Sequence, residues 1–267
     1  MIGIIGGTGV GKFDLDDGPL PVTVTTPWGV AYAQTGRLRG RDVFFLARHG
    51  AGHKIPPHRI NYRANIAALK QLGVRAILAT TAVGGLKKEL KPGDLLLLDD
   101  LLDFTRDRTG KTFFDGDHGT PVVHTDFTHP YSPPLRSVLL GAASAAGIAM
   151  RPTGTYLCND GPRYETPAEV RMFAQWGGDV VGMTGVPEAQ LAREAGIHYA
   201  GISLVTNPGA GISPTPLTHT EVEEAMQAAG PKLRTLLTEA IARLDAANLP
   251  PIGPEIELPV TFGEATG

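Results

Sequence analysis

The sequence has a single cysteine, Cys158, among its 267 residues. A lone cysteine excludes an intramolecular disulfide and is typical of a protein kept in a reducing compartment. No run of about 20 apolar residues occurs, which is the length that a membrane-spanning helix needs. No basic start followed by an apolar stretch is present, so a secretory signal is not expected. These absences predict a soluble cytoplasmic protein without a membrane partner.

The chain also lacks a marked excess of charge of either sign. Its formal net charge is −3, so nothing in the composition indicates a surface for nucleic acid. Hydrophobic residues make up 42% of the chain, which is sufficient for one large domain or two small ones. The 34 glycines and 22 prolines are dispersed between apolar runs, so they indicate turns and not disorder.

Apolar runs alternate with helical patterns along most of the chain. Buried strands are predicted at 1–5, 43–47, 76–80, 95–98, 180–183 and 200–205. Helices are expected at 61–72, 135–146, 166–176, 187–195 and 218–244. Capping boxes open the helices that begin at Thr166 and Thr218. The alternation predicts an α/β fold with a mixed or mostly parallel sheet. Residues 1–247 are expected to form one domain, followed by a loosely held extension at 248–267.

Several predicted strands end in small polar or glycine-containing segments. These segments are 6–9 (Gly-Gly-Thr-Gly), Arg48-His49, Thr81-Ala82, Thr184-Gly185 and Asn207. In open α/β sheets, ligands bind at the carboxyl ends of the strands. A sheet that brings these ends together would therefore form one binding site.

The segment GGTGVGKF at 6–13 matches the phosphate loop of nucleoside triphosphatases only in part. That motif ends in Ser or Thr, which holds magnesium, whereas Phe13 stands here and cannot bind a metal. The dinucleotide-binding pattern also fails, because Lys12 occupies its third glycine position. Two interpretations stay open: a nest of backbone N–H groups that holds phosphate together with Thr8, or a plain turn after a strand.

The segment RHGAGHKIPPH at 48–58 combines Arg48 with His49, His53 and His58. A forked guanidinium beside an imidazole is suited to an oxyanion. The spacing of the first two histidines would suit a metal on a helix, but two glycines and a proline disfavour a helix there. No cysteine or carboxylate nearby completes a ligand set. A solvated basic loop is the other interpretation.

The segment NDGPRYETPAE at 159–169 places Tyr164 and Glu165 directly before a helix. Glu165 could simply favour the helix dipole. Because Thr166 already caps the helix, Glu165 is free to face a ligand. Tyr164 can stack on a flat ring. An aromatic ring with a carboxylate is suited to a heterocycle that carries an N–H donor.

These motifs belong to a longer series that runs in order from about residue 2 to residue 245. The series is IIGGTG, FLARHG, NYRANIAALK, TTAVGGL, PGDLLLLDDLLDFT, FFDGDH, DGPRYETPAE, GMTGVPEAQLAREAGI and LVTN. It resembles the trimeric purine nucleoside phosphorylase family, in the branch close to the methylthioadenosine phosphorylases. The resemblance implies a single-domain three-layer α/β sandwich with a central mixed sheet, the nucleoside phosphorylase fold. It also implies phosphorolysis, in which phosphate attacks C1′ of a purine nucleoside and releases the base.

The resemblance also assigns residues to the site. The implied phosphate ligands are Thr8, Arg48, His49, Thr81, Thr184 and the N–H of Ala82. Met183 would lie against the ribose, and Tyr164 and Glu165 against the base. His124 and Phe127 would complete the sugar pocket of a neighbouring subunit, which implies a homotrimer or a hexamer built from two trimers. Inorganic phosphate is then a co-substrate, and neither a cofactor nor a metal is expected.

The chemistry of such a site depends on charge. The glycosidic bond breaks through an oxocarbenium-like state, as in glycoside hydrolysis. A phosphate anion held beneath C1′ stabilises that charge and is already placed to attack. The leaving base is stabilised by groups on its edge. The residues expected to take part in this step are His49, Glu165 and Asn207.

Asn207 is expected to determine which base is bound, although an Asn can also merely begin a turn. Adenine-specific members of the family carry Asp here and again two residues on, whereas this chain has Asn207 and Gly209. An amide can donate to O6 and accept from N7–H of a 6-oxopurine. Glu165 would accept from N1–H, which adenine lacks. The sequence therefore predicts a preference for inosine and guanosine over adenosine.

His219, in the segment THTEVEEAM, is expected to contact a 5′-hydroxyl, or else merely to begin a helix. Methylthio-specific members have an apolar residue near the start of the last helix. A 5′-methylthioinosine or methylthioadenosine phosphorylase is therefore the alternative. A nucleoside triphosphatase and a non-catalytic nucleoside sensor are weaker rivals, because Phe13 cannot hold magnesium and the implied phosphate ligands are all in place.

Overall fold

The computed structural model describes residues 1–7, 15–106, 110–213, 219–254 and 257–259, without the side chains of His219 and Glu221. The strands are β1 (Ile2–Gly6), β2 (Leu20–Thr26), β3 (Gly29–Leu38), β4 (Arg41–Ala47), β5 (Ala76–Gly85), β6 (Leu95–Leu97), β7 (Asp100–Asp103), β8 (Thr155–Cys158), β9 (Val180–Gly182) and β10 (His198–Pro208). The helices are α1 (Tyr62–Gln71), α2 (Pro133–Ala145), α3 (Pro167–Gln175), α4 (Gly185–Glu194) and α5 (His219–Arg243), with short 3-10 turns η1 (Pro57–Arg59) and η2 (Ala246–Asn248).

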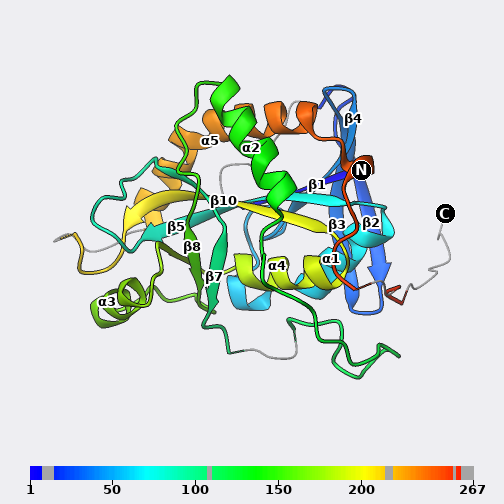
Figure 1. Cartoon of the computed structure of the whole chain (residues 1–267), viewed down its shortest axis with the longest axis horizontal. Helices are drawn as coiled ribbons and strands as arrows, with labels where there is room; N and C mark the ends of the chain where they lie inside the picture. The colour runs from blue at the N-terminus through cyan, green and yellow to red at the C-terminus, as the bar shows by residue number, and fades with distance from the viewer. Residues whose placement is uncertain (8–14, 107–109, 214–218, 255–256, 260–267) are drawn as a thin grey trace.

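All ten strands of the described residues belong to one mixed sheet. Its main path is β2-β3-β4-β1-β5-β9-β8-β7, and β10 pairs with β5 and β6 beside that path. β1 lies parallel to β4 and β5, and β10 lies parallel to β5. The pairs β2–β3, β3–β4, β5–β9 and β6–β10 are antiparallel. Figure 1 shows β5 and β10 side by side in the middle of the molecule.

Helices cover both faces of this sheet (Figure 1). Neighbouring residues of β5, Ile77 and Leu78, point into different apolar clusters. The cluster around Ile77 includes buried side chains of α1 and α4, and the cluster around Leu78 includes those of α2 and α5. Helix α3 packs in a smaller cluster against β8 and β9. The predicted three-layer α/β sandwich with a central mixed sheet is confirmed.

Two central strands are longer than the apolar runs from which they were predicted. β5 continues through Thr81 and Ala82, and β10 continues through Asn207 to Pro208. The two strand ends pair with each other, with a register shift just before Asn207. Backbone pairing extends both strands into polar sequence, so Thr81, Ala82 and Asn207 lie inside strands and not after them.

The capping box at the start of α3 is confirmed. The hydroxyl of Thr166 accepts from the N–H of Glu169 at 3.2 Å, and the Glu169 carboxylate accepts from the N–H of Thr166 at 2.8 Å. This reciprocal pair holds the segment before α3, including Glu165, at a defined position. The other predicted capping box begins at Thr218, which lies outside the described residues.

The described part of the C-terminal extension contacts the rest of the chain. Arg75 donates to the carbonyl of Leu249 at 2.8 Å, and Nε2 of His198 donates to the carbonyl of Pro250 at 2.7 Å. The side chain of Leu258 is buried in the apolar cluster of the α1–α4 face. These contacts differ from the expectation of a loosely held extension, whereas the division of the chain at residue 247 stays a prediction.

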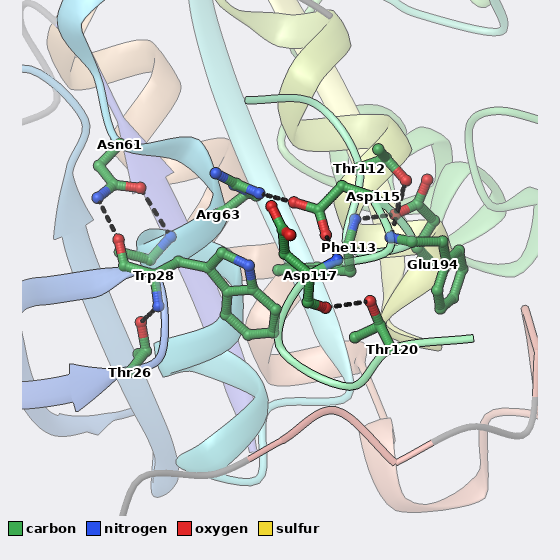
Figure 2. A network of polar contacts seen from close by, with 12 residues as sticks. Thr26, Trp28, Asn61, Arg63, Thr112, Phe113, Asp115, Asp117, Thr120 and Glu194 are labelled. Carbon is green, nitrogen blue, oxygen red and sulfur yellow. Dashed lines mark hydrogen bonds and ion pairs between the residues drawn. The ribbon is translucent and has the colours of Figure 1, made fainter. Parts of the chain in front are cut away.

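A polar network holds the segment after β7 against α1 and α4 (Figure 2). Asp115 of this segment pairs with Arg63 of α1. Glu194, at the end of α4, accepts from the N–H of Phe113 at 2.7 Å. The segment that leads to His124 is therefore fixed to the same layer of helices.

Candidate active site

A cavity of about 380 Å³ opens beside the carboxyl-terminal half of β5. β5 pairs with β1 along residues 76–79 and with β9 at residues 84 and 85. Between these stretches, no strand of the described residues pairs with β5 on that side. Thr81, Ala82 and Val83 line the cavity at this gap. Its volume is that of a small-molecule site.

The cavity brings together most of the residues that the sequence assigned to a site. Those that line it are Arg48, His49, Thr81, Ala82, Tyr164, Glu165, Met183, Thr184 and Asn207. Thr8 and the side chain of His219 lie outside the described residues. His124 is exposed and does not line the cavity. Phe127 is partly buried against the core of its own chain.

Arg48 follows β4 and is almost completely buried. Its Nε donates to Oε1 of Glu188 at 2.5 Å, and its Nη2 donates to Oε2 of Glu188 at 2.8 Å. Its Nη1 donates to the carbonyl of Thr80 at 2.8 Å. Burial is the largest single influence and acts against the charged guanidinium, but the charge and hydrogen bonds of Glu188, together with smaller contributions from Tyr199 and Tyr62, raise the pKa of Arg48 on balance. Arg48 therefore keeps its charge at the cavity wall.

His49 carries no charge near neutral pH. Its Nδ1 lies 2.8 Å from the carbonyl of Ile55 and must be the donor there, because a carbonyl only accepts. Nε2 of the neutral ring is then an acceptor. Burial is the main cause that lowers the pKa of His49 to about 4, and the charge of Arg48 adds to it. The ring of His53, which also lines the cavity, lies 4.0 Å from that of His49 between centroids.

β5 offers both a hydroxyl and a backbone donor to the cavity. The hydroxyls of Thr81 and Ser203 lie 2.9 Å apart, so β10 orients the Thr81 side chain. The carbonyl of Thr80 faces Arg48, and main-chain groups alternate sides along a strand. The N–H of Ala82 therefore faces the same side as that carbonyl. Such donors are suited to the oxygens of phosphate.

Thr184 stands at the positive end of the α4 dipole. The N–H groups of Thr184 and Gly185 each lie 3.2 Å from the hydroxyl of Tyr156, which accepts from both. Because Tyr156 is fully buried, it fixes the start of α4. The side chain of Thr184 makes no capping hydrogen bond, and the residue lines the cavity.

Glu165 and Tyr164 also line the cavity. Nδ2 of Asn159 donates to Oε1 of Glu165 at 3.0 Å. Burial raises the pKa of Glu165, while the hydrogen bond from Asn159 favours the charged form and opposes that rise. A carboxylate that is held at one oxygen can still accept from the N–H of a ligand.

The amide of Asn207 has a defined orientation. Its Nδ2 lies 3.0 Å from the carbonyl of Pro208, which only accepts, and its Oδ1 accepts from the hydroxyl of Thr206 at 2.8 Å. One N–H and one lone pair of the amide remain for a ligand. At Gly209, a Cβ atom would lie 2.9 Å from the carbonyl of Gly85. A side chain two residues after Asn207 would therefore require the strand ends to move.

Three residues that the sequence did not single out also contribute to this cavity. Asn159 holds Glu165, Glu188 holds Arg48, and Val222 of α5 lines the cavity itself. Asn159 directly follows β8, so its place at a strand end was a usable signal. Glu188 has the position of an ordinary acidic residue in the first turn of a helix, and no sequence signal distinguishes it.

Within the described ranges, no group of three or more His, Cys, Asp or Glu side chains is arranged to hold a metal ion. The expectation of a site without metal or cofactor stays a prediction. No helix in the part of the chain that the structure describes is long and apolar enough to cross a membrane.

Comparison with known proteins places this geometry in a family. A model described as the phosphorylase superfamily matches residues 1–242. The chain is 54% identical over 243 residues to a probable 6-oxopurine nucleoside phosphorylase of Dictyoglomus turgidum, covering 91% of each chain. It is 48% identical over 247 residues to a probable S-methyl-5′-thioinosine phosphorylase of Methanothermobacter thermautotrophicus, covering 91% of this chain and 84% of that one.

The fold is also shared with a solved structure. Methylthioadenosine phosphorylase from Schistosoma mansoni, in complex with adenine, matches with a TM-score of 0.86 and 35% identity, over 91% of this chain and 90% of that one. The chain belongs to the phosphorylase superfamily.

Proposed function

We propose that this protein is a 6-oxopurine nucleoside phosphorylase, which reversibly converts inosine or guanosine and phosphate into free base and ribose 1-phosphate. The observation that carries this proposal is the presence of Glu165 and Asn207 in the same cavity as Arg48, His49 and Thr81. One part of the cavity offers groups for an oxyanion, and the other offers groups for the edge of a base. Membership of the phosphorylase superfamily and the named relative from Dictyoglomus turgidum support the same reaction.

The phosphate ligands are Thr8, Arg48, His49, Thr81, Thr184 and the N–H of Ala82. They hold phosphate beneath C1′, where a phosphate oxygen forms the new bond as the C1′–N9 bond breaks. The anion stabilises the positive charge that develops on the sugar. The electrons of the broken bond leave with the base. The proton that HPO₄²⁻ carries balances the reaction, because the base is released neutral and ribose 1-phosphate as the dianion.

The base is recognised by the hydrogen-bonding groups of Asn207 and Glu165 that their contacts within the protein leave available. The free N–H of Asn207 donates to O6, and its Oδ1 accepts from N7–H as the base leaves. Glu165 accepts from N1–H of hypoxanthine or guanine. Adenine presents an acceptor at N1, and two opposed acceptors cost about 1–3 kcal/mol. Inosine and guanosine are therefore preferred over adenosine.

The second candidate is a 5′-methylthioinosine phosphorylase. The observation in its favour is Val222, an apolar side chain near the start of α5 that lines the cavity. The relative from Methanothermobacter thermautotrophicus carries this name. A hydroxyl at the 5′ position would instead be met by His219. The two candidates share the base-binding residues and differ only at the 5′ group.

The proposal includes a homotrimer, either alone or paired into a hexamer. A second cavity, of about 700 Å³, shares Pro57 and Met183 with the first and is lined by Arg63 and Lys111 among others. Its position supports closure by a neighbouring subunit, which would bring His124 to the sugar. The protein is proposed to act in the cytoplasm without cofactor or metal, and its buried free thiol at Cys158 is consistent with a reducing compartment.

The test is phosphate-dependent release of base from inosine, guanosine, adenosine and 5′-methylthioinosine, measured side by side with a chelator present. Rapid cleavage of inosine or guanosine with little from adenosine is the expected result. A large advantage of 5′-methylthioinosine would select the second candidate. Preferred cleavage of adenosine, or cleavage that needs no phosphate, would overturn the proposal.

A further inference from the structure

We propose that Glu188 is a positioning residue, which holds the guanidinium of Arg48 in the orientation that meets phosphate. The inference rests on the proposed function, because it requires that Arg48 binds phosphate. Glu188 does not line the cavity, so it acts through Arg48 and not on the substrate.

The contacts of Arg48 leave its guanidinium little freedom. Glu188 accepts from two of its nitrogens, at 2.5 and 2.8 Å, and the carbonyl of Thr80 accepts from the third at 2.8 Å. A guanidinium has five N–H donors in a fixed plane. Three are occupied, so one N–H on each terminal nitrogen remains for a ligand. The plane of the guanidinium, and hence the direction of these two donors, is set by Glu188.

Glu188 is itself held in place. The hydroxyl of Tyr199, on β10, donates to Oε2 of Glu188 at 2.8 Å. Glu188 and Tyr199 are both buried, and burial raises the pKa of Tyr199, so its hydroxyl stays a donor. The carboxylate is thus fixed from one side by β10 and pairs with Arg48 on the other.

The place of Glu188 on α4 links it to the cavity. It lies four residues after Thr184, and residues with this spacing share one face of a helix. The same face of α4 therefore has Thr184 at the cavity and the carboxylate of Glu188 on Arg48. A buried ion pair gains little over apolar packing, so stability alone is a weak reason for this pair.

The experiment compares Glu188→Gln and Tyr199→Phe with the unmodified protein, by measuring KM for phosphate and KM for inosine. A glutamine can accept from only one of the two nitrogens, so we expect KM for phosphate to rise at least about tenfold. KM for inosine should stay within about twofold, because its contacts are unchanged. Tyr199→Phe removes one hydrogen bond and no charge, and it should raise KM for phosphate by a smaller factor.

Glu194→Gln is the matched control. Glu194 is a second buried carboxylate of α4, but it accepts from Phe113 and lies outside the cavity lining (Figure 2). Its loss should leave KM for phosphate unchanged. A rise as large as that of Glu188→Gln would indicate general damage to α4 and overturn the proposal.

A double-mutant cycle separates positioning from folding. In an Arg48→Met background, Glu188→Gln should raise KM for phosphate no further, because the group that it positions is gone. An added increase in that background, or equal increases for phosphate and inosine, would overturn the inference. If Glu188→Gln does not fold, an unchanged KM for phosphate in Tyr199→Phe would overturn it instead. If Arg48→Met alone leaves KM for phosphate unchanged, the phosphate site of the proposed function is wrong as well.

Discussion

The choice between inosine and adenosine should depend on pH through Glu165. Burial raises the pKa of this carboxyl, and the hydrogen bond from Asn159 limits that rise. Above its pKa, Glu165 is ionised and accepts from N1–H of inosine. Below its pKa, the protonated carboxyl can donate to N1 of adenosine. The ratio of kcat/KM for inosine to that for adenosine should therefore fall as the pH is lowered through the pKa of Glu165.

Replacing Asn159 by alanine gives this effect a magnitude. A hydrogen bond to a charged group contributes about 1.5–3 kcal/mol, against about 0.5–1.5 kcal/mol for a neutral group. Its loss should therefore disfavour the charged form of Glu165 by about 1 kcal/mol relative to the protonated form, so the pKa of Glu165 should rise. The pH at which the ratio is halfway between its limits should move upward with that pKa. Asn248→Ala is the control, because it removes an Asn-to-carboxylate bond of 2.7 Å at an exposed site outside the cavity.

The assay is the initial rate with each nucleoside from pH 5 to pH 8, at saturating phosphate and constant ionic strength. Because both nucleosides use the same phosphate and the same His49, the titration of these groups cancels in the ratio. A ratio that does not change with pH, in either the unmodified protein or Asn159→Ala, would refute the account of Glu165. A midpoint that moves to lower pH in Asn159→Ala would refute the role of the hydrogen bond.

Three further predictions concern other parts of the cavity. Asn207→Asp replaces a donor by an acceptor, so kcat/KM should fall about tenfold or more for inosine and rise for adenosine, and an unchanged preference would contradict the base assignment. The folded-state pKa of His49 is about 4, below its ordinary 6.5, so stability should decline as the pH falls from 6.5 to 4. The free energy of unfolding should therefore fall less between pH 7 and pH 4 in His49→Gln than in the unmodified protein, by roughly 2 kcal/mol after allowance for the partial exposure of His49. Urea unfolding at the two pH values measures this difference. Gly182→Ala would place a Cβ 2.2 Å from the hydroxyl of Tyr156, which holds the start of α4. Tm should therefore drop by several degrees, and KM for phosphate should rise. An unchanged Tm would show that the Tyr156 side chain can move aside without cost.

The buried central strands of the sheet could be predicted from the sequence, but the strands at its edge could not. Buried strands such as β1 and β4 appear as short apolar runs, because both of their faces are covered. β2 and β3 alternate buried with exposed residues at the edge of the sheet, where Tyr32 is 72% exposed, and no apolar run marks them. β5 and β10 were predicted too short, since their polar ends are held by backbone pairing with each other.

The residues that can touch a ligand were likewise easier to predict than those that hold them. Arg48, Thr184 and Asn207 follow apolar runs, and the rule for strand ends locates such positions. Asn159 acts on a side chain only 6 residues away and follows a strand, whereas Glu188 acts on Arg48, which is 140 residues away in sequence. A contact between residues so far apart as Arg48 and Glu188 leaves no periodic pattern in one chain. Its discovery requires the three-dimensional arrangement.

The pairing of β5 with β10 also fixes a distance along the cavity. Thr81 lines the cavity where phosphate is proposed to bind, and Gly84, in register with Asn207, lines it where the base is proposed to bind. Three steps along a strand span about 10 Å, and covalent bonds with in-register pairing fix that length. Helices at the rim of the cavity can change the affinity for a nucleoside, but they cannot change this distance. In the proposed site, substrates are therefore selected first by the distance between their reacting carbon and the far edge of their ring.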